Sequence, residues 1–316
     1  MKTLIEIQNL SKSFQAGPGQ VLMAVGGISL QINRGETLGV VGESGCGKST
    51  LARTVAGLYR PTCGQVVFDG IQVHRARGQQ KKNLCRRMQM IFQNPDTSLN
   101  PRMTAGEIVG EALDIHRLAR GGERRQRIVE LLRLVGLDPG HAGRFPHEFS
   151  GGQRQRIGMA RALAVEPEFL ICDEPISALD VSIQAQIIDL LEELQEDLGL
   201  TYLFIAHDLS VVRRISHRVA VMYLGRVVEL APRDPLYENP LHPYTQALLA
   251  AEPVADPDLA ASRRRVLLAG DPPSPVNPPP GCAFSRRCPN AAAVCRERIP
   301  ALRSAGSGRL AACHFV

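Results

Sequence analysis

The sequence predicts an α/β fold in which helices flank a parallel sheet. Short runs of apolar and β-branched residues recur along the chain, and amphipathic helical stretches lie between them. The apolar runs are continuous and do not alternate with polar residues, which is typical of strands buried on both faces.

Five apolar runs are the predicted strands: residues 37–41 (TLGVV), 88–92 (MQMIF), 169–172 (FLIC), 202–206 (YLFIA) and 219–225 (VAVMYLG). Helices are predicted over 128–135 and 183–198, where an apolar stripe lies behind a charged face. Gly199 follows the second of these helices and is expected to end it. From about Asn94 to Phe149 the pattern is helical without a convincing strand, so this segment is expected to be a helical insertion.

The composition changes after about Leu230, where proline and glycine become dense. Such a change is typical of a linker. We therefore expect a body over residues 1–235, with a helical subdomain at about 94–155, and an extension over 236–316 that carries a linker and four cysteines.

The composition excludes several classes of protein. Hydrophobic residues make up 44% and charged residues 22%, which are ordinary globular values. The sequence has no apolar run long enough to span a bilayer, and Glu6 interrupts the N-terminus before a signal peptide could form. The expected compartment is the cytosol, where thiols stay reduced.

The net charge is +6, with basic clusters at Arg86–Arg87, Arg124–Arg125 and Arg263–Arg265. Such clusters either contact phosphate groups or are simply solvated. The chain has no Trp and only 4% aromatic residues, so it has no platform on which nucleic-acid bases could stack. We therefore expect no nucleic-acid partner.

A phosphate-binding loop is predicted directly after the run 37–41. It reads Gly42-Glu43-Ser44-Gly45-Cys46-Gly47-Lys48-Ser49-Thr50, fits GxxxxGK(S/T), and precedes a predicted helix over Ser49–Leu58. The glycines let backbone N–H groups face phosphate oxygens, and the helix N-terminus adds a favourable field. Lys48 is expected to hold the β- and γ-phosphates, Ser49 to offer its hydroxyl to Mg²⁺, and Cys46 to be incidental.

Two acids, Asp173 and Glu174, follow the run 169–172. Asp173 is expected to ligate Mg²⁺ directly or to lie in its second shell. Glu174 is placed to polarise a water for attack on a γ-phosphate. Because a phosphate loop lies upstream, the pair favours a nucleotide-hydrolysing site over a simple acidic turn.

The run Phe149-Ser150-Gly151-Gly152-Gln153 opens a predicted helix that extends to about Ala164. A serine N-cap and two glycines at a helix start form an anion site. The run resembles the LSGGQ signature of ABC-transporter ATPases, with Phe149 in place of the usual Leu. Further motifs of that family follow in order: Phe14 in LSKSF, Gln93 in MIFQNP, Asp180 in SALD and His207 in FIAHD.

This resemblance implies an ABC-type P-loop domain with a RecA-like core and a helical subdomain. It implies that Gln93 is a catalytic and Mg²⁺-ligating glutamine, that His207 is the switch histidine, and that Phe14 stacks on adenine. Asp180 belongs to the corresponding D-loop. Two ATPase chains of this family sandwich two ATP molecules, so Ser150, Gly151, Gly152 and Gln153 are expected to contact ATP bound by a partner chain.

Longer motifs resemble the dipeptide and oligopeptide importer ATPases: residues 93–101 (QNPDTSLNP), 223–229 (YLGRVVE), 239–249 (NPLHPYTQALL) and the run PSPVNPPPGC. This resemblance implies a subunit at the cytoplasmic face of the membrane. Its expected partners are a second ATPase chain (often a different one), two membrane permeases and an extracytoplasmic peptide-binding protein. Nickel and glutathione stay open as cargo. A soluble ABC ATPase acting on nucleic acid is the rival, but the sequence lacks the second ATPase domain or insertion usual there.

Four of the eight cysteines lie in the last 35 residues, at Cys282, Cys288, Cys295 and Cys313. Their spacing lacks the C-x2-C pairs of most structural zinc sites. Soft thiolates suit either Zn²⁺ or an iron–sulfur cluster, and free thiols are a third alternative. The resemblance to peptide-importer ATPases implies that these four cysteines hold a 4Fe–4S cluster.

Overall fold

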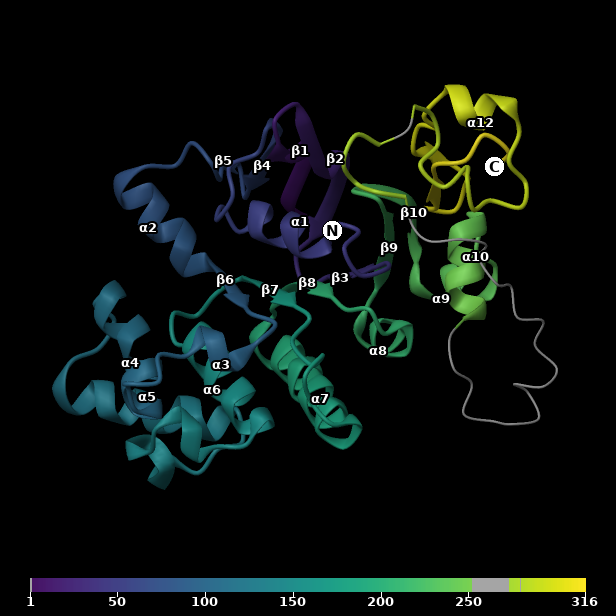
Figure 1. Ribbon diagram of the computed structural model, residues 1–316. Coiled ribbons are helices and arrows are strands. Elements are labelled where there is room, and N and C mark those ends of the chain that lie inside the picture. Colours follow the sequence, from purple (N-terminus) through teal and green to yellow (C-terminus); the bar gives the residue numbers. More distant parts are fainter. Residues whose placement is uncertain (1, 252–272, 279) are drawn as a thin grey trace, which may run out of the picture. The chain divides into compact units, whose positions relative to one another are not determined.

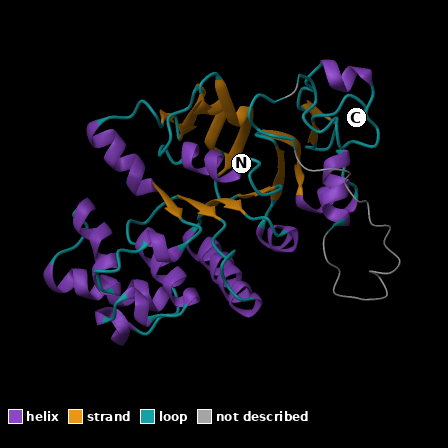
Figure 2. Cartoon of the chain, viewed as in Figure 1, coloured by secondary structure: helices purple, strands orange, loops and turns teal. Residues whose placement is uncertain are grey.

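The computed structural model describes residues 2–251, 273–278 and 280–316 (Figures 1 and 2). The chain forms two compact units, and each is built from separated stretches of sequence. Unit 1 comprises Met1–Ile5, Gln31–Thr37 and Val67–Ala206. Unit 2 comprises Glu6–Leu30, Leu38–Val66 and His207–Val316. The predicted cluster Arg263–Arg265 and part of the proline-rich run lie outside the described residues.

The sheet of unit 1 contains three parallel strands in the order β6-β7-β8. They are β6 (Met88–Ile91), β7 (Phe169–Asp173) and β8 (Thr201–Ile205). Every residue of β7 and β8 is buried. This burial explains why both strands read as continuous apolar runs, and it confirms the predicted strands to within one or two residues.

Helices make up most of the rest of unit 1. They are α2 (Gly78–Arg87), α3 (Pro95–Ser98), α4 (Ala105–His116), α5 (Gly121–Leu134), α6 (Gly151–Leu163) and α7 (Val181–Leu198), with short 3-10 turns η1 (Pro139–Gly143) and η2 (Pro146–Glu148). Figure 1 shows α3 to α6 gathered together. Within residues 94–149, all of which the structure describes, the only regular elements are helices, as predicted. Gly199 ends α7 in the left-handed conformation, also as predicted.

In unit 2, β3 (Thr37–Val41) runs parallel to β9 (Arg218–Tyr223), which pairs antiparallel with β10 (Arg226–Pro232). Two short strands near the C-terminus, β11 (Arg303–Ser304) and β12 (Leu310–Ala311), extend this sheet beyond β10. The C-terminal segment is therefore built into the unit that contains the phosphate loop. The division of the chain at residue 235 stays a prediction.

A second group of strands was not predicted from the sequence. β1 (Thr3–Gly17), β2 (Gln20–Asn33) and β4 (Cys63–Phe68) pair in the order β2-β1-β4, and β5 (Ile71–Gln72) pairs with the end of β4. Buried and exposed residues are interleaved along β1 and β2. A search for continuous apolar runs therefore passes over them.

The helices of unit 2 are α1 (Lys48–Val55), α8 (Leu209–Ile215), α9 (Arg233–Glu238), α10 (Pro243–Ala250) and α12 (Ala293–Glu297). α1 begins one residue before its predicted start and ends three residues before its predicted end. In the described part of the chain, no helix combines the length and the apolar character needed to cross a bilayer.

Candidate functional site

The phosphate loop joins β3 to α1 within unit 2, as predicted. Gly47 caps α1 with a φ of 104°, and a Cβ there would collide with the carbonyl oxygen of Ala24. Gly42 has a φ of 153°, and a Cβ there would collide with the carbonyl oxygen of Met222. Both positions therefore need glycine, because neighbouring carbonyl groups occupy the space that a side chain would take, and the loop backbone forms a cradle around the side chain of Lys48.

Lys48 lies inside this cradle and is only 4% exposed. Its Nζ donates to the carbonyl oxygens of Gly42 at 2.8 Å and of Glu43 at 3.2 Å. A lysine with this placement supplies a point charge at the centre of the loop, where phosphate oxygens would bind.

The remaining residues of the loop divide into supporting and accessible ones. Cys46 is buried, and burial raises the pKa of its thiol, so it stays protonated and supports the loop. Its carbonyl accepts from Gly225 N at 2.8 Å. Ser44 and Gly45 are exposed, and Ser49 and Thr50 are half-buried in the first turn of α1.

Phe14 lies on β1 and is 36% exposed. Its ring meets the ring of Tyr59 edge-on at 5.6 Å, and Lys12 Nζ lies 4.7 Å from its centroid. An exposed aromatic ring offers a face for a planar base, so the placement is compatible with its predicted contact with adenine. His207, also in unit 2, is exposed where the chain leaves β8.

The carboxylate pair lies at the carboxyl end of β7 in unit 1. Asp173 is fully buried, whereas Glu174 is half-buried with a φ of 47°. Left-handed backbone is uncommon for a residue other than glycine and tends to occur at functional sites. Gln93 Nε2 donates to Glu174 Oε2 at 2.9 Å, so the structure brings together two predicted catalytic side chains.

The predicted signature forms the N-terminus of α6, also in unit 1. Ser150 and Gln153 form a capping box, with Ser150 N donating to Gln153 Oε1 at 3.0 Å. A Cβ on Gly152 would collide with the side chain of Ile183 on α7, so this glycine allows the two helices to pack closely. Gly151 lies beside Leu179 of the segment that leads into α7.

Two arginines of α6 that the sequence analysis missed tie the signature helix to the segment after Gln93. Arg154 pairs with Asp96, and its Nε donates to the carbonyl of Phe149 at 3.0 Å. Arg161 Nη1 donates to the carbonyl of Ser98 at 2.7 Å. The only sequence signal was their position on the helix that the signature opens.

The predicted nucleotide residues are thus distributed over both units. Unit 1 carries Gln93, the signature Ser150–Gln153, Asp173, Glu174, and Asp180, which is exposed at the N-cap of α7. Unit 2 carries Phe14, the loop Gly42–Thr50 and His207.

The four C-terminal cysteines lie in unit 2 and line one cavity of about 180 Å³. Cys282 N donates to the carbonyl of Cys295 at 2.7 Å, which draws two of them together through the backbone. Burial, and to a smaller extent the neighbouring thiols, raise the pKa values of Cys282 and Cys288. His314, beside Cys313, has its Nε2 3.0 Å from the carbonyl of Arg298.

No three His, Cys, Asp or Glu side chains among the described residues converge as ligands for one metal ion. The four cysteines predicted as cluster ligands thus line one cavity. Their binding of a 4Fe–4S cluster stays a prediction.

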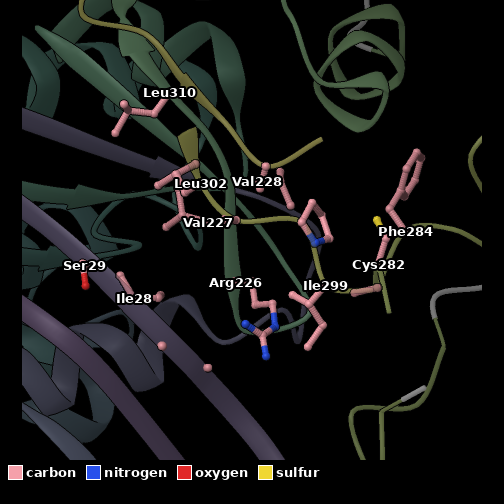
Figure 3. Close-up of a pocket in the computed structure, with 16 residues that line it drawn as sticks. Ile28, Ser29, Arg226, Val227, Val228, Cys282, Phe284, Ile299, Leu302 and Leu310 are labelled. Carbon is pink, nitrogen blue, oxygen red and sulfur yellow. The ribbon is translucent and has the colours of Figure 1, made fainter. Parts of the chain in front are cut away.

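A larger cavity of about 620 Å³ lies on another side of the same segment. Figure 3 shows Ile28 and Ser29 of β2, Arg226 to Val228 of β10, and Cys282 and Phe284 around it. Cys282 and Phe284 line both cavities, which places the first cysteine at the boundary between them.

Comparison with known proteins identifies the family. The family model described as ABC transporter matches residues 25–177, and the one described as Oligopeptide/dipeptide transporter, C-terminal region, matches residues 228–295. The putative oligopeptide transport ATP-binding protein YkfD of Bacillus subtilis is 53% identical over 99% of this chain and 95% of that protein. The oligopeptide transport ATP-binding protein OppF of Escherichia coli is 51% identical over 95% of this chain and 93% of that protein.

Solved structures agree with this assignment. A dimeric ATP-binding cassette in a post-hydrolysis state, bound to ADP and Pi, matches with a TM-score of 0.67 and 32% identity, over 73% of this chain and 99% of that chain. The phosphate loop, the signature helix and the carboxylate pair thus occur in a chain that resembles oligopeptide transport ATP-binding proteins over nearly its full length. The chain belongs to the ABC-transporter ATP-binding proteins, in the oligopeptide/dipeptide transporter branch.

Proposed function

We propose that this ATPase is the motor subunit of an importer for dipeptides or oligopeptides. The observation that carries the proposal is the match of residues 228–295 to the C-terminal region of oligopeptide and dipeptide transporters. Relatives named as oligopeptide transport ATP-binding proteins align along nearly the whole chain. ATP binding and hydrolysis would drive conformational change in membrane permeases, with nickel or glutathione as alternative cargo.

ATP would bind through the phosphate loop. The backbone N–H groups of the loop would donate to phosphate oxygens, and Lys48, now bonded to two loop carbonyls, would transfer its N–H donors to the β- and γ-phosphates. Phe14 would stack on adenine. Mg²⁺, held by Ser49, Gln93 and Asp173, would neutralise charge on the phosphates.

Hydrolysis would depend on Glu174 as the general base. The hydrogen bond from Gln93 Nε2 would orient the carboxylate of Glu174, which would accept a proton from the attacking water. His207 would orient the water and the γ-phosphate, and Asp180 would contact the nucleotide at the dimer interface. These roles follow the family pattern residue by residue.

The working assembly would contain two ATPase chains. Ser150, Gly151, Gly152 and Gln153 would contact ATP held by the partner chain, since a capped helix start with two glycines is a ready anion site. We propose a heterodimer that docks on two permeases at the cytoplasmic face of the membrane. An extracytoplasmic peptide-binding protein would deliver the cargo.

We propose that Cys282, Cys288, Cys295 and Cys313 hold a 4Fe–4S cluster. All four line one cavity, which fits a Cys₄ donor set. Zn²⁺ is the alternative occupant, because it too is bound by four thiolates. The bound group would brace a loop-rich segment that has little apolar core of its own.

Protein purified without oxygen is expected to be brown and to contain about four irons per chain. Replacing Cys288 by serine is expected to remove most of the iron, because one of four ligands is lost. Cys85→Ser, at an exposed thiol outside the cavity, is the matched control and should keep the iron. Metal analysis that finds one zinc and no iron would overturn the cluster.

The cargo is tested by transport in proteoliposomes that contain the cognate permeases and binding protein. We expect ATP-dependent uptake of labelled dipeptides or oligopeptides, and uptake of only nickel or glutathione would contradict the peptide assignment. ATPase activity that rises with DNA or RNA but not with the permeases would favour the nucleic-acid rival. The structure gives that rival little support, since Arg87 pairs with Asp69 and Glu168, and Arg124 with Asp114.

A further inference from the structure

Glu43, the second residue of the phosphate loop, is held by three different groups of unit 2. Its backbone N–H donates to Tyr244 Oη at 3.0 Å, and its carbonyl accepts from Lys48 Nζ at 3.2 Å. Its carboxylate oxygens lie 3.0 and 2.9 Å from Nη1 of Arg287. Two of these three groups, Tyr244 and Arg287, come from the C-terminal part of the chain. The conformation of the loop therefore depends on residues far away in sequence.

Arg287 lies between Cys282 and Cys288, and its side chain is only 8% exposed, against 26% for Glu43. The pair is thus largely shielded from water, and its interaction is screened less than that of a surface pair. Removing the guanidinium would leave a partly buried carboxylate without its counter-charge beside the phosphate loop. Such a pair restricts the loop far more than an exposed one.

The segment that carries Arg287 is fixed by an aromatic cluster. Phe284 is fully buried, and its ring lies 5.3 Å from Tyr223, 5.4 Å from Tyr244 and 5.7 Å from His242. Arg287 N donates to the carbonyl of Phe284 at 2.9 Å, so the turn after Phe284 sets where the guanidinium points. Arg287 is therefore held in position by the turn that follows the buried ring of Phe284.

A buried acid holds the start of α10 and with it Tyr244. Glu229 of β10 accepts from the backbone N–H groups of Leu241 and His242, both at 2.9 Å. The runs 223–229 and 239–249 resemble the importer branch. Tyr244, in the second run, places its hydroxyl against the phosphate loop and its ring against Phe284 of the cysteine segment.

We propose that Arg287 is a positioning residue for the phosphate loop. By holding the loop through this arginine, the cysteine-bearing segment sets the affinity of the ATPase for ATP. The proposal rests on the assignment of the loop at Gly42–Thr50 as the ATP phosphate site. Arg287 acts through Glu43 and does not touch the nucleotide. Its loss should therefore change ATP binding more than the chemical step.

The test is ATP binding and steady-state hydrolysis by full-length Arg287→Ala. We expect the Kd and KM for ATP to rise about tenfold, with kcat changed by less than about twofold, because a broken, shielded charge pair weakens a site without altering the reacting groups. Arg286→Ala is the matched control, since Arg286 is the preceding residue and its side chain is exposed. Arg287→Lys should recover part of the affinity.

Glu43→Gln gives a second route, because it keeps the size of the side chain and removes only the charge. It should weaken ATP binding to a similar extent, and the double variant should be no weaker than either single one. ATP affinity within twofold of wild type in folded Arg287→Ala, or fully additive losses in the double variant, would overturn the proposal. If Lys48→Ala still binds ATP, the loop assignment itself fails, which is a separate outcome.

Discussion

Replacing Glu174 by glutamine is expected to abolish ATP hydrolysis while ATP binding survives. The amide keeps an acceptor oxygen for Gln93 Nε2, so the geometry at the end of β7 should persist, but the base that accepts the proton from water is lost. We expect kcat to fall by at least about 100-fold, the lower end of what a positioned general base contributes. Phosphate release and retention of labelled ATP measure the two effects separately.

A trapped state should accompany this loss. Because ATP is bound but not cleaved, the variant should retain nucleotide through gel filtration and, in the family's arrangement, should stay paired with a second ATPase chain. Glu196→Gln removes an exposed acid of α7 and serves as the control for loss of charge. Turnover at the wild-type rate in Glu174→Gln would refute the assignment of Glu174 as the base.

Replacing Lys48 by alanine is expected to remove ATP binding rather than to slow the chemical step alone. Its buried Nζ is the cation at the centre of the glycine cradle, and charge-assisted hydrogen bonds to phosphate are among the strongest that a site makes. We expect the Kd for ATP to rise by about 100-fold or more. Titration with a fluorescent ATP analogue measures the change.

Lys81→Ala, which removes an exposed lysine of α2, is the matched control and should bind ATP like the wild type. Thermal unfolding of both variants separates lost binding from lost folding, because Lys48 also holds two carbonyls of its own loop. A folded Lys48→Ala with unchanged ATP affinity would contradict the assignment of the loop.

The strands buried on both faces could be predicted, because nearly every residue of such a strand is apolar, as in β7 and β8. The same reasoning missed β1 and β2, because buried and exposed residues are mixed along both strands and alternate one by one over residues 26–32 of β2. It also missed Arg154 and Arg161, whose partners are backbone carbonyls and an acid of another helix. The sequence around an arginine does not specify which distant carbonyl or acid it will contact.

The sequence by itself determined the local elements of the site. Gly47 has left-handed backbone at the start of α1, which favours glycine, and Ser150 and Gln153 cap α6 through contacts three residues apart. Such features depend on residues close by in the sequence, so a short motif is enough to predict them.

Only the tertiary structure decided what the C-terminal segment does for the loop. Arg287 and Glu43 are separated by 244 positions, and nothing in either local sequence specifies that they meet. Their contact depends on how Phe284 packs against Tyr223 and Tyr244, and therefore on the folding of the whole unit. The same packing brings four widely spaced cysteines to one cavity, because side-chain packing and not sequence spacing sets which distant residues touch.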